Sequence, residues 1–202
     1  KETGLKPATI ARHIVSIRAL FHFLMINDHI IYDPSIYLEP PKPDRQTPHI
    51  ITLETTTALL NAPDTSKASG LRDRAMLELL YATGIRVSEL VALNINQVNL
   101  SLGYLQCISP SGKERFVPFG SYAKQAVEEY LSKGRDQLVT ERTTAEVLFL
   151  NHLGSRMTRQ GFWKILKKYG KEVDIEEDIT PQTLRHSVAV HLLQNGADVH
   201  VV

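Results

Sequence analysis

Two arginines stand where a polypeptide chain is well suited to hold an anion. Arg86 lies at the junction where one helical pattern ends and the next begins, within residues 82–90. Arg185 lies in the first turns of a helix that Thr180 caps and Pro181 opens. A helix N-terminus favours anions through its free N–H groups and its dipole, and a guanidinium adds a planar fork that matches two phosphate oxygens. Taken singly, each arginine is explained more simply by an ion pair with a nearby acid or by capping of a neighbouring helix.

A concentration of positive charge precedes the second arginine. Residues 155–171 contain six basic residues and no acid, whereas residues 172–178 contain five acids and no base. Such segregation makes a local positive face that neutralises phosphates, although the net charge of +1 does not by itself indicate a nucleic-acid binder. The alternative is a solvated helix face followed by an acidic loop. The candidates for contacts with backbone phosphates are Arg159, Lys164, Lys167 and Lys168.

Several other kinds of chemistry are excluded. The sequence has no Gly-rich loop ending in Gly-Lys-Ser/Thr, no His-Glu-x-x-His and no Gly-x-Ser-x-Gly. The eight histidines are scattered without metal-ligand spacing, and Cys107 is the sole cysteine, which excludes a disulfide framework and a cysteine-rich zinc site. No run approaches the roughly 18 consecutive apolar residues of a membrane span. With an ordinary composition, these features predict a soluble, cytoplasmic protein.

The elements that must position the two arginines are mostly helices. Apolar residues at helical spacing, with capping residues at the ends, predict helices over residues 7–24, 52–60, 71–83, 86–92, 122–131, 159–169 and 181–194. Between them, short strands over residues 98–100, 104–108 and 115–118 are separated by turns at Gly103 and at residues 110–112. The sequence therefore predicts a mainly helical α+β fold with a small three-stranded antiparallel sheet.

A proline-rich stretch indicates a domain boundary. Residues 40–48 contain four prolines among charged residues, a composition that forms a semi-extended linker. Residues 1–39 are too short for a complete domain, and residues 49–202 form the second domain. The chain opens without methionine and closes in what reads as the start of a further helix, so we expect it to be a fragment.

Two segments of the second domain resemble the conserved boxes of the tyrosine recombinase, or phage integrase, family. Residues 82–90 resemble the first box and residues 180–198 the second, with residues 113–118 and 157–163 in matching order between them. The resemblance is greatest to the Xer-type site-specific recombinases and covers residues 48–202. It implies a helical catalytic domain that lacks its C-terminal segment here. Residues 1–39 resemble the last helices of the family's N-terminal DNA clamp.

The resemblance implies phosphoryl transfer on duplex DNA without a metal or other cofactor. In the family, a tyrosine attacks the scissile phosphate to give a 3′-phosphotyrosine link, and a freed 5′-hydroxyl reverses it. Two arginines hold the non-bridging oxygens and a hairpin lysine protonates the leaving oxygen. Arg86 and Arg185 match the two arginines. The implied partners are duplex DNA and other copies or relatives, as a homo- or hetero-tetramer on synapsed DNA and a monomer in solution, with no membrane.

The sequence departs from the family pattern at three places. Gln182 stands where the family usually has histidine, and glutamine donates a hydrogen bond but relays no proton. The hairpin lysine is expected at Pro110, whereas Lys113 lies three residues later, either as its replacement or as a contact to backbone phosphate. The nucleophilic tyrosine is expected beyond Val202, and Tyr169 is expected to be a core or DNA-facing aromatic.

Three functions follow from these observations. The first is a site-specific recombinase or integrase that is an enzyme at full length and inactive as this fragment. The second is a degenerate relative that binds DNA without cutting it, as Gln182 and Pro110 suggest. The third is a helical interaction protein unrelated to DNA, which the near-zero net charge suggests.

Overall fold

The computed structural model of the chain describes residues 4–41, 50–108, 112–175 and 179–198. The chain divides into two compact units, Lys1–Thr47 and Pro48–Val202. Pro110 and Ser111, which belong to the predicted second turn of the sheet, lie outside the described residues.

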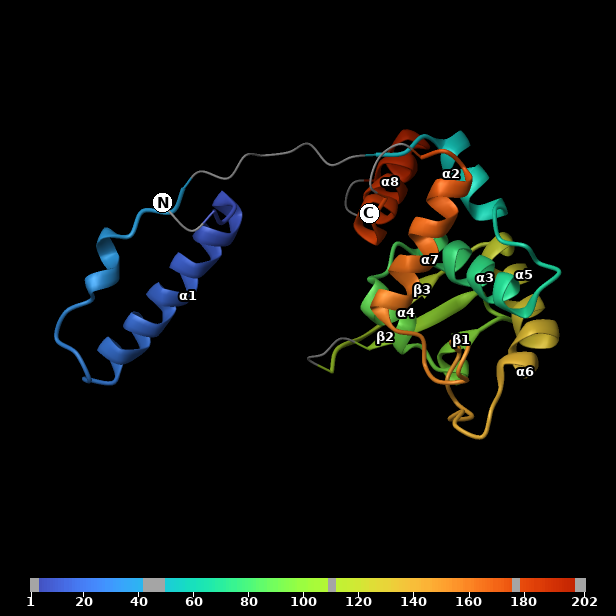
Figure 1. Ribbon diagram of the computed structural model, residues 1–202, viewed down its shortest axis with the longest axis horizontal. Helices are drawn as coiled ribbons and strands as arrows, with labels where there is room; N and C mark the ends of the chain where they lie inside the picture. Colours follow the sequence, from blue (N-terminus) through green and yellow to red (C-terminus); the bar gives the residue numbers. More distant parts are fainter. Residues whose placement is uncertain (1–3, 42–49, 109–111, 176–178, 199–202) are drawn as a thin grey trace. The chain divides into compact units, whose positions relative to one another are not determined.

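The first unit consists of helix α1 (Pro7–Ile26) and a 3₁₀ turn (Pro34–Tyr37) (Figure 1). Helix α1 begins with proline at its first position, as predicted. Arg18 Nη2 donates to the Leu38 carbonyl at 2.8 Å and so joins the helix to the chain after the turn. By length and composition α1 is able to cross a bilayer, with a mean hydropathy of 1.3, although one such helix is weak support for a membrane segment. A search for unbroken apolar runs misses it because Arg12 and Arg18 interrupt the pattern.

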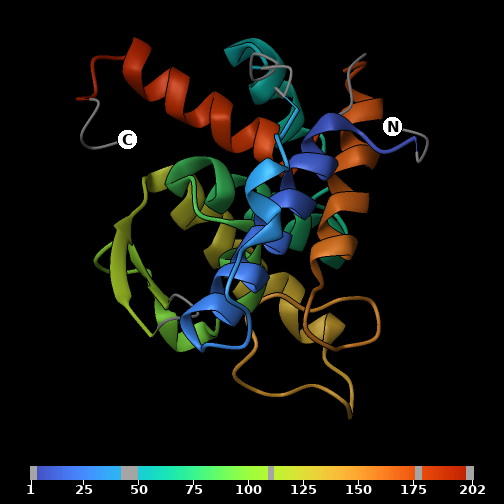
Figure 2. The ribbon, with the colours of Figure 1, turned by 90° about the vertical axis from the view of Figure 1, so that its left-hand side faces the viewer.

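The second unit is mainly helical, as predicted, and carries one small sheet (Figure 1). Its helices are α2 (Leu53–Asn61), α3 (Ala68–Thr83), α4 (Val87–Ala92), α5 (Ser121–Glu129), α6 (Arg135–Leu138), α7 (Arg159–Glu172) and α8 (Pro181–Gln194). Its strands are β1 (Val98–Asn99), β2 (Tyr104–Ile108) and β3 (Glu114–Pro118). In the view of Figure 2 the two longer strands lie at one edge of this unit, with α8 above them and α7 towards the opposite side.

The sheet is antiparallel with the order β1-β2-β3. Leu105 on β2 faces Val98 on β1 and Val117 on β3. Side chains alternate between the two faces of β2, so that Leu105 and Cys107 are buried whereas Ile108 is exposed. Antiparallel pairing with β2 fixes the register of β3 and places Arg115 opposite Cys107.

Helix α3 is the centre of the core. The stripe predicted from the sequence is buried, and so are residues on its other faces, because α2, α5 and α8 all contact it. The stripe consists of Leu71, Ala75, Met76, Leu79 and Leu80. The helix ends at Gly84, whose φ of 57° places it in the left-handed region that suits glycine.

One predicted helix continues further than expected. The prediction ended at about residue 131, but α5 runs into a π-helical turn (Tyr130–Gly134) and then into α6. The buried Tyr130 hydroxyl donates to the Leu148 carbonyl at 3.1 Å, and Arg135 Nη2 donates to the Val147 carbonyl at 2.8 Å. These long-range bonds stabilise a helix that the local sequence, with a glycine at position 134, does not favour.

A buried ionic network joins α3 to α7. Arg72 donates two hydrogen bonds to Asp73 Oδ1, at 2.9 and 2.7 Å, and one to the Leu150 carbonyl at 3.0 Å. The hydroxyl of Tyr169 on α7 donates to Asp73 Oδ2 at 3.0 Å. Burial raises the pKa of Tyr169, and the neighbouring carboxylate adds to the rise. Tyr169 is therefore a residue of the core.

Replacing the Tyr169 hydroxyl tests this network. Tyr169→Phe leaves Asp73 Oδ2 buried without its donor, so we expect the free energy of unfolding to fall by about 1–3 kcal/mol. Urea denaturation followed by circular dichroism measures it. The matched control is Tyr122→Phe, because the Tyr122 side chain is 77% exposed. Equal stability of the two variants would contradict a structural role for the Asp73–Tyr169 bond.

Candidate functional site

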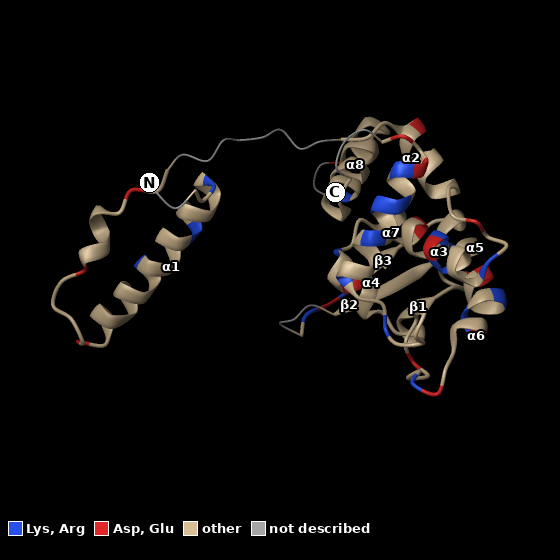
Figure 3. Cartoon of the chain, in the orientation of Figure 1, with Lys and Arg blue, Asp and Glu red and all other residues tan. Residues whose placement is uncertain are grey.

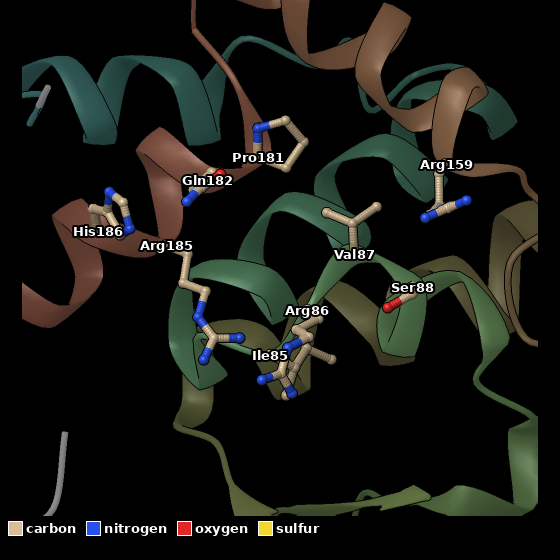
Figure 4. Close-up of a pocket in the computed structure, with 9 residues that line it drawn as sticks. All are labelled: Ile85, Arg86, Val87, Ser88, Arg159, Pro181, Gln182, Arg185 and His186. Carbon is tan, nitrogen blue, oxygen red and sulfur yellow. The ribbon is translucent and has the colours of Figure 1, made fainter. Parts of the chain in front are cut away.

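The two predicted arginines line one pocket of about 480 Å³ (Figure 4). The pocket lies where the N-terminal ends of α4, α7 and α8 meet. Its lining residues are Ile85, Arg86, Val87, Ser88, Arg159, Pro181, Gln182, Arg185 and His186. Residues that are far apart in the sequence thus supply three guanidinium groups, a hydroxyl, an amide and an imidazole to a single space.

Arg86 owes its place to the way α3 ends. Gly84 turns the chain in the left-handed conformation, buried Ile85 anchors the corner, and Arg86 is the N-cap of α4. A Cβ added at Gly84 would lie 3.7 Å from Val188 on α8, so the corner and α8 are in close approach. The Arg86 side chain is 67% exposed and points into the pocket (Figure 4).

A buried carboxylate lies beneath Arg86. Glu89, at the third position of α4, accepts the Arg86 backbone N–H at 2.8 Å. Its two oxygens also accept Nη1 and Nη2 of Arg115 on β3, at 2.7 and 2.8 Å. The Arg86 guanidinium is more distant, with Nη1 at 3.9 Å from Glu89 Oε1. The hydrogen bonds from Arg115 hold the pKa of Glu89 below its usual range, so this carboxyl is ionised at neutral pH.

Arg185 has a guanidinium nitrogen without a partner. It lies in the second turn of α8, and its Nη1 is buried with no hydrogen-bond partner among the described residues. Arg185 also lines a second cavity of about 350 Å³, between α8 and β3. A buried donor left unpaired costs roughly 1–3 kcal/mol, more when charged, so this N–H group is disposed to donate to an anionic oxygen.

Helix α8 is held firmly against the rest of the unit. Thr180 caps it by accepting the Thr183 N–H at 3.0 Å. Further along, Ser187 Oγ accepts the Ile51 N–H at 3.0 Å, and His191 Nε2 lies 3.1 Å from the Ile51 carbonyl. The other ring nitrogen of His191 lies 3.0 Å from the hydroxyl of Tyr81 on α3. These contacts fix the direction in which α8 presents Arg185.

Two more polar side chains of α8 line the pocket. Gln182 is exposed and His186 is half-buried, and both lie on the side of α8 that borders Arg185 (Figure 4). Gln182 was a candidate from the sequence. His186 was not, although it directly follows Arg185 in the second box. Glu89 and Arg115 were also missed; an acid three residues after a helix start was the available signal for Glu89.

Of the remaining predicted residues, Arg159 lines the pocket and the lysines do not. Arg159 lines the pocket from the first position of α7, and the three candidate lysines lie farther along that helix (Figure 3). Lys164 and Lys168 are exposed, with Lys168 Nζ 3.8 Å from Glu172, while Lys167 Nζ lies 4.1 Å from the centre of the Trp163 ring. Lys113 is exposed immediately before β3 and does not line the pocket.

The pocket is suited to bind a tetrahedral anion. Permanently charged guanidinium groups line it from the N-terminal ends of α4, α7 and α8, and Gln182 adds a hydrogen-bond donor. None of the chain's tyrosines lines the pocket. The described pocket therefore supplies charge and hydrogen bonds for a phosphate and supplies no tyrosine nucleophile.

Comparison with known proteins gives one family. The phage integrase family matches residues 49–202. Over its whole length the chain is 46% identical to a tyrosine recombinase XerD of Listeria innocua and 48% identical to one of Oceanobacillus iheyensis. In each case the match covers 68% of the relative's length. Among solved structures, XerA recombinase superposes with a TM-score of 0.66 at 25% identity, over 99% of this chain and 73% of that one. XerH recombinase bound to a palindromic difH substrate superposes with a TM-score of 0.80 at 20% identity, over 98% of this chain and 60% of that one.

The unpaired nitrogen of Arg185 gives a stability prediction. Arg185→Met removes a buried donor that has no partner in the described part of the chain and keeps an unbranched side chain, so we expect the free energy of unfolding to rise by about 1 kcal/mol. Urea denaturation measures it in phosphate-free buffer. Arg86→Met is the matched control and should change stability by less than about 0.5 kcal/mol, since that side chain is mostly exposed. A loss of stability in Arg185→Met alone would show that the guanidinium stabilises the unliganded fold.

Proposed function

We propose that this chain, which belongs to the phage integrase family, acts in site-specific recombination by breaking and rejoining duplex DNA through a 3′-phosphotyrosine link. The observation that carries the proposal is the convergence of Arg86 and Arg185 on one pocket. The names of the relatives, which are tyrosine recombinases, support a cutting enzyme over a relative that only binds DNA.

The two arginines are proposed to bind the non-bridging oxygens of the scissile phosphate. As a tyrosine oxygen bonds to phosphorus and the 5′-oxygen leaves, negative charge collects on these two oxygens. Cations fixed in place beforehand stabilise that charge without reorganising. Arg185 Nη1, buried and unpaired among the described residues, suits one oxygen, and the exposed fork of Arg86 suits the other.

The residues that would transfer protons are less clearly placed around the pocket than the two arginines. Gln182 is proposed to donate a hydrogen bond to the phosphate, and because an amide relays no proton we expect a slower reaction than with histidine. His186, which lines the same pocket, is the imidazole nearest in sequence to Arg185. Lys113 is exposed immediately before β3 and does not line the pocket. We therefore propose Lys113 as a second candidate, after His186, for the proton donor.

Duplex DNA is the proposed partner, and α7 is proposed to extend the contact beyond the scissile phosphate. Arg159 lines the pocket, and the lysines follow it along α7 (Figure 3). Such contacts position a protein on DNA but do not select a sequence. We propose that four subunits, identical or related, act on synapsed DNA, and that the protein works in the cytoplasm, where bacterial chromosomes lie.

A covalent adduct tests the proposed reaction. The complete protein, incubated with nicked duplexes made from its own genome, should form a protein–DNA complex that survives denaturing electrophoresis. Arg86→Ala and Arg185→Ala should each lower the rate of adduct formation by about 10²–10³-fold, because each removes fixed charge from the transition state. Arg74→Ala, which alters a half-buried arginine on α3 outside the pocket, is the control. Duplex binding without any adduct would instead identify a relative that binds and does not cut.

The salt dependence of duplex binding tests the role of α7. Alanine at Lys164, Lys167 and Lys168 together should reduce the slope of log K against log salt by roughly one unit for each DNA phosphate that the variant no longer neutralises. Fluorescence anisotropy with a labelled duplex measures the slope. Lys124→Ala on α5 is the control, since Lys124 lies 3.8 Å from Glu128 and far from α7 in sequence. An unchanged slope in the triple variant would show that these lysines do not bind the DNA backbone.

A further inference from the structure

We infer that Arg115 is a positioning residue for the phosphate clamp: by occupying the Glu89 carboxylate, it keeps the Arg86 guanidinium available for phosphate. The inference rests on the proposed function. Arg115 lines the neighbouring cavity rather than the pocket of Arg86 itself, and it acts through Glu89.

The geometry has one buried carboxylate between two arginines. Glu89 has a side chain that is 7% exposed, and Arg115 takes both of its oxygens in a bidentate pair at 2.7 and 2.8 Å. Arg86 approaches no closer than 3.9 Å with its guanidinium, although its own backbone N–H is bonded to the same carboxylate. Bidentate arginine–carboxylate pairs are among the strongest hydrogen-bonded contacts, so Glu89 pairs with Arg115 in preference to Arg86.

Without Arg115, Glu89 would pair with Arg86 instead. A buried carboxylate without a partner is costly, and Arg86 is the nearest other cation that the described residues offer to Glu89. The two lie three residues apart, within reach of a helical ion pair. The Arg86 guanidinium would then pair with Glu89, and its charge would no longer be available for phosphate.

The ion pair between Arg115 and Glu89 also joins two elements of the second unit. Arg115 lies on β3, two residues after Lys113, whereas Glu89 lies on α4. The pair therefore fixes strand β3 to helix α4, whose N-cap is Arg86. A single ion pair both sets the charge state around Arg86 and joins the two segments that the resemblance assigns to the reaction.

The experiment follows the Arg86 guanidinium directly by NMR of ¹⁵N-labelled arginine side chains, with inorganic phosphate as the probe. In the wild type we expect averaged Nη signals for Arg86 and a shift on adding phosphate. In Arg115→Ala the Arg86 Nη signals should become distinct as the group pairs with Glu89, and the dissociation constant for phosphate should rise about tenfold. In the double variant Arg115→Ala with Glu89→Gln, both properties should return to within about twofold of the wild type.

The double variant separates positioning from folding, because both variants lack the β3–α4 ion pair and only one retains the carboxylate charge. Arg115→Lys, which keeps a charge but not the fork, should give an intermediate phosphate affinity. Arg74→Ala is the control, since Arg74 Nε lies 4.0 Å from the buried carboxylate of Glu78, outside the pocket. It should leave the Arg86 signals unchanged.

Two results would overturn the inference: an Arg86 guanidinium that stays mobile in Arg115→Ala, or a double variant that binds phosphate as weakly as Arg115→Ala. Failure of the proposed function gives a different pattern. The Arg86 signals would then still respond to the removal of Arg115, which supports the inferred pairing, while neither Arg86 nor Arg185 would shift with phosphate in the wild type.

Discussion

The second unit has to hold three like charges, the guanidinium groups of Arg86, Arg159 and Arg185, around one pocket. Guanidinium groups repel each other, and acids nearby would bind and neutralise them. Arg86 is kept in place by a helix corner and Arg185 by a capped helix, and the one buried carboxylate at hand is occupied from the sheet side by Arg115. Helix α3 contributes to both supports, because its C-terminal end forms the corner and its Tyr81 contacts α8.

Much of this fold could be predicted from local sequence. The bounds of α8 agree with the prediction at both ends, because Thr180 and Pro181 start the helix and the apolar spacing continues until residues 195 and 196 interrupt it. The prediction was wrong where distant contacts override local preference. The helix after α5 continues because Tyr130 and Arg135 bond to carbonyls in residues 145–148, and nothing in the sequence around residue 130 indicates that partner segment.

For the site, too, local sequence predicts some residues and distant contacts decide others. Arg86 and Arg185 could be found from the sequence because helix starts leave local signals, and the structure brings the two into one pocket. The pairing of Glu89 with Arg115 could not, since it depends on how the sheet lies against α4. The roles of Lys113, Gln182 and the α7 lysines remain predictions, because charge and order along the chain do not say which side chains reach a bound phosphate.

The bonds at Ile51 give the second unit a mechanical property. Both backbone groups of this residue, the N–H and the carbonyl, are bonded to side chains of α8, at Ser187 and His191. Ile51 lies just after the proline-rich stretch that joins the two units. The backbone at this residue is therefore bonded directly to the helix that carries Arg185. A pull on the backbone at Ile51 would act on α8 directly, through these two bonds.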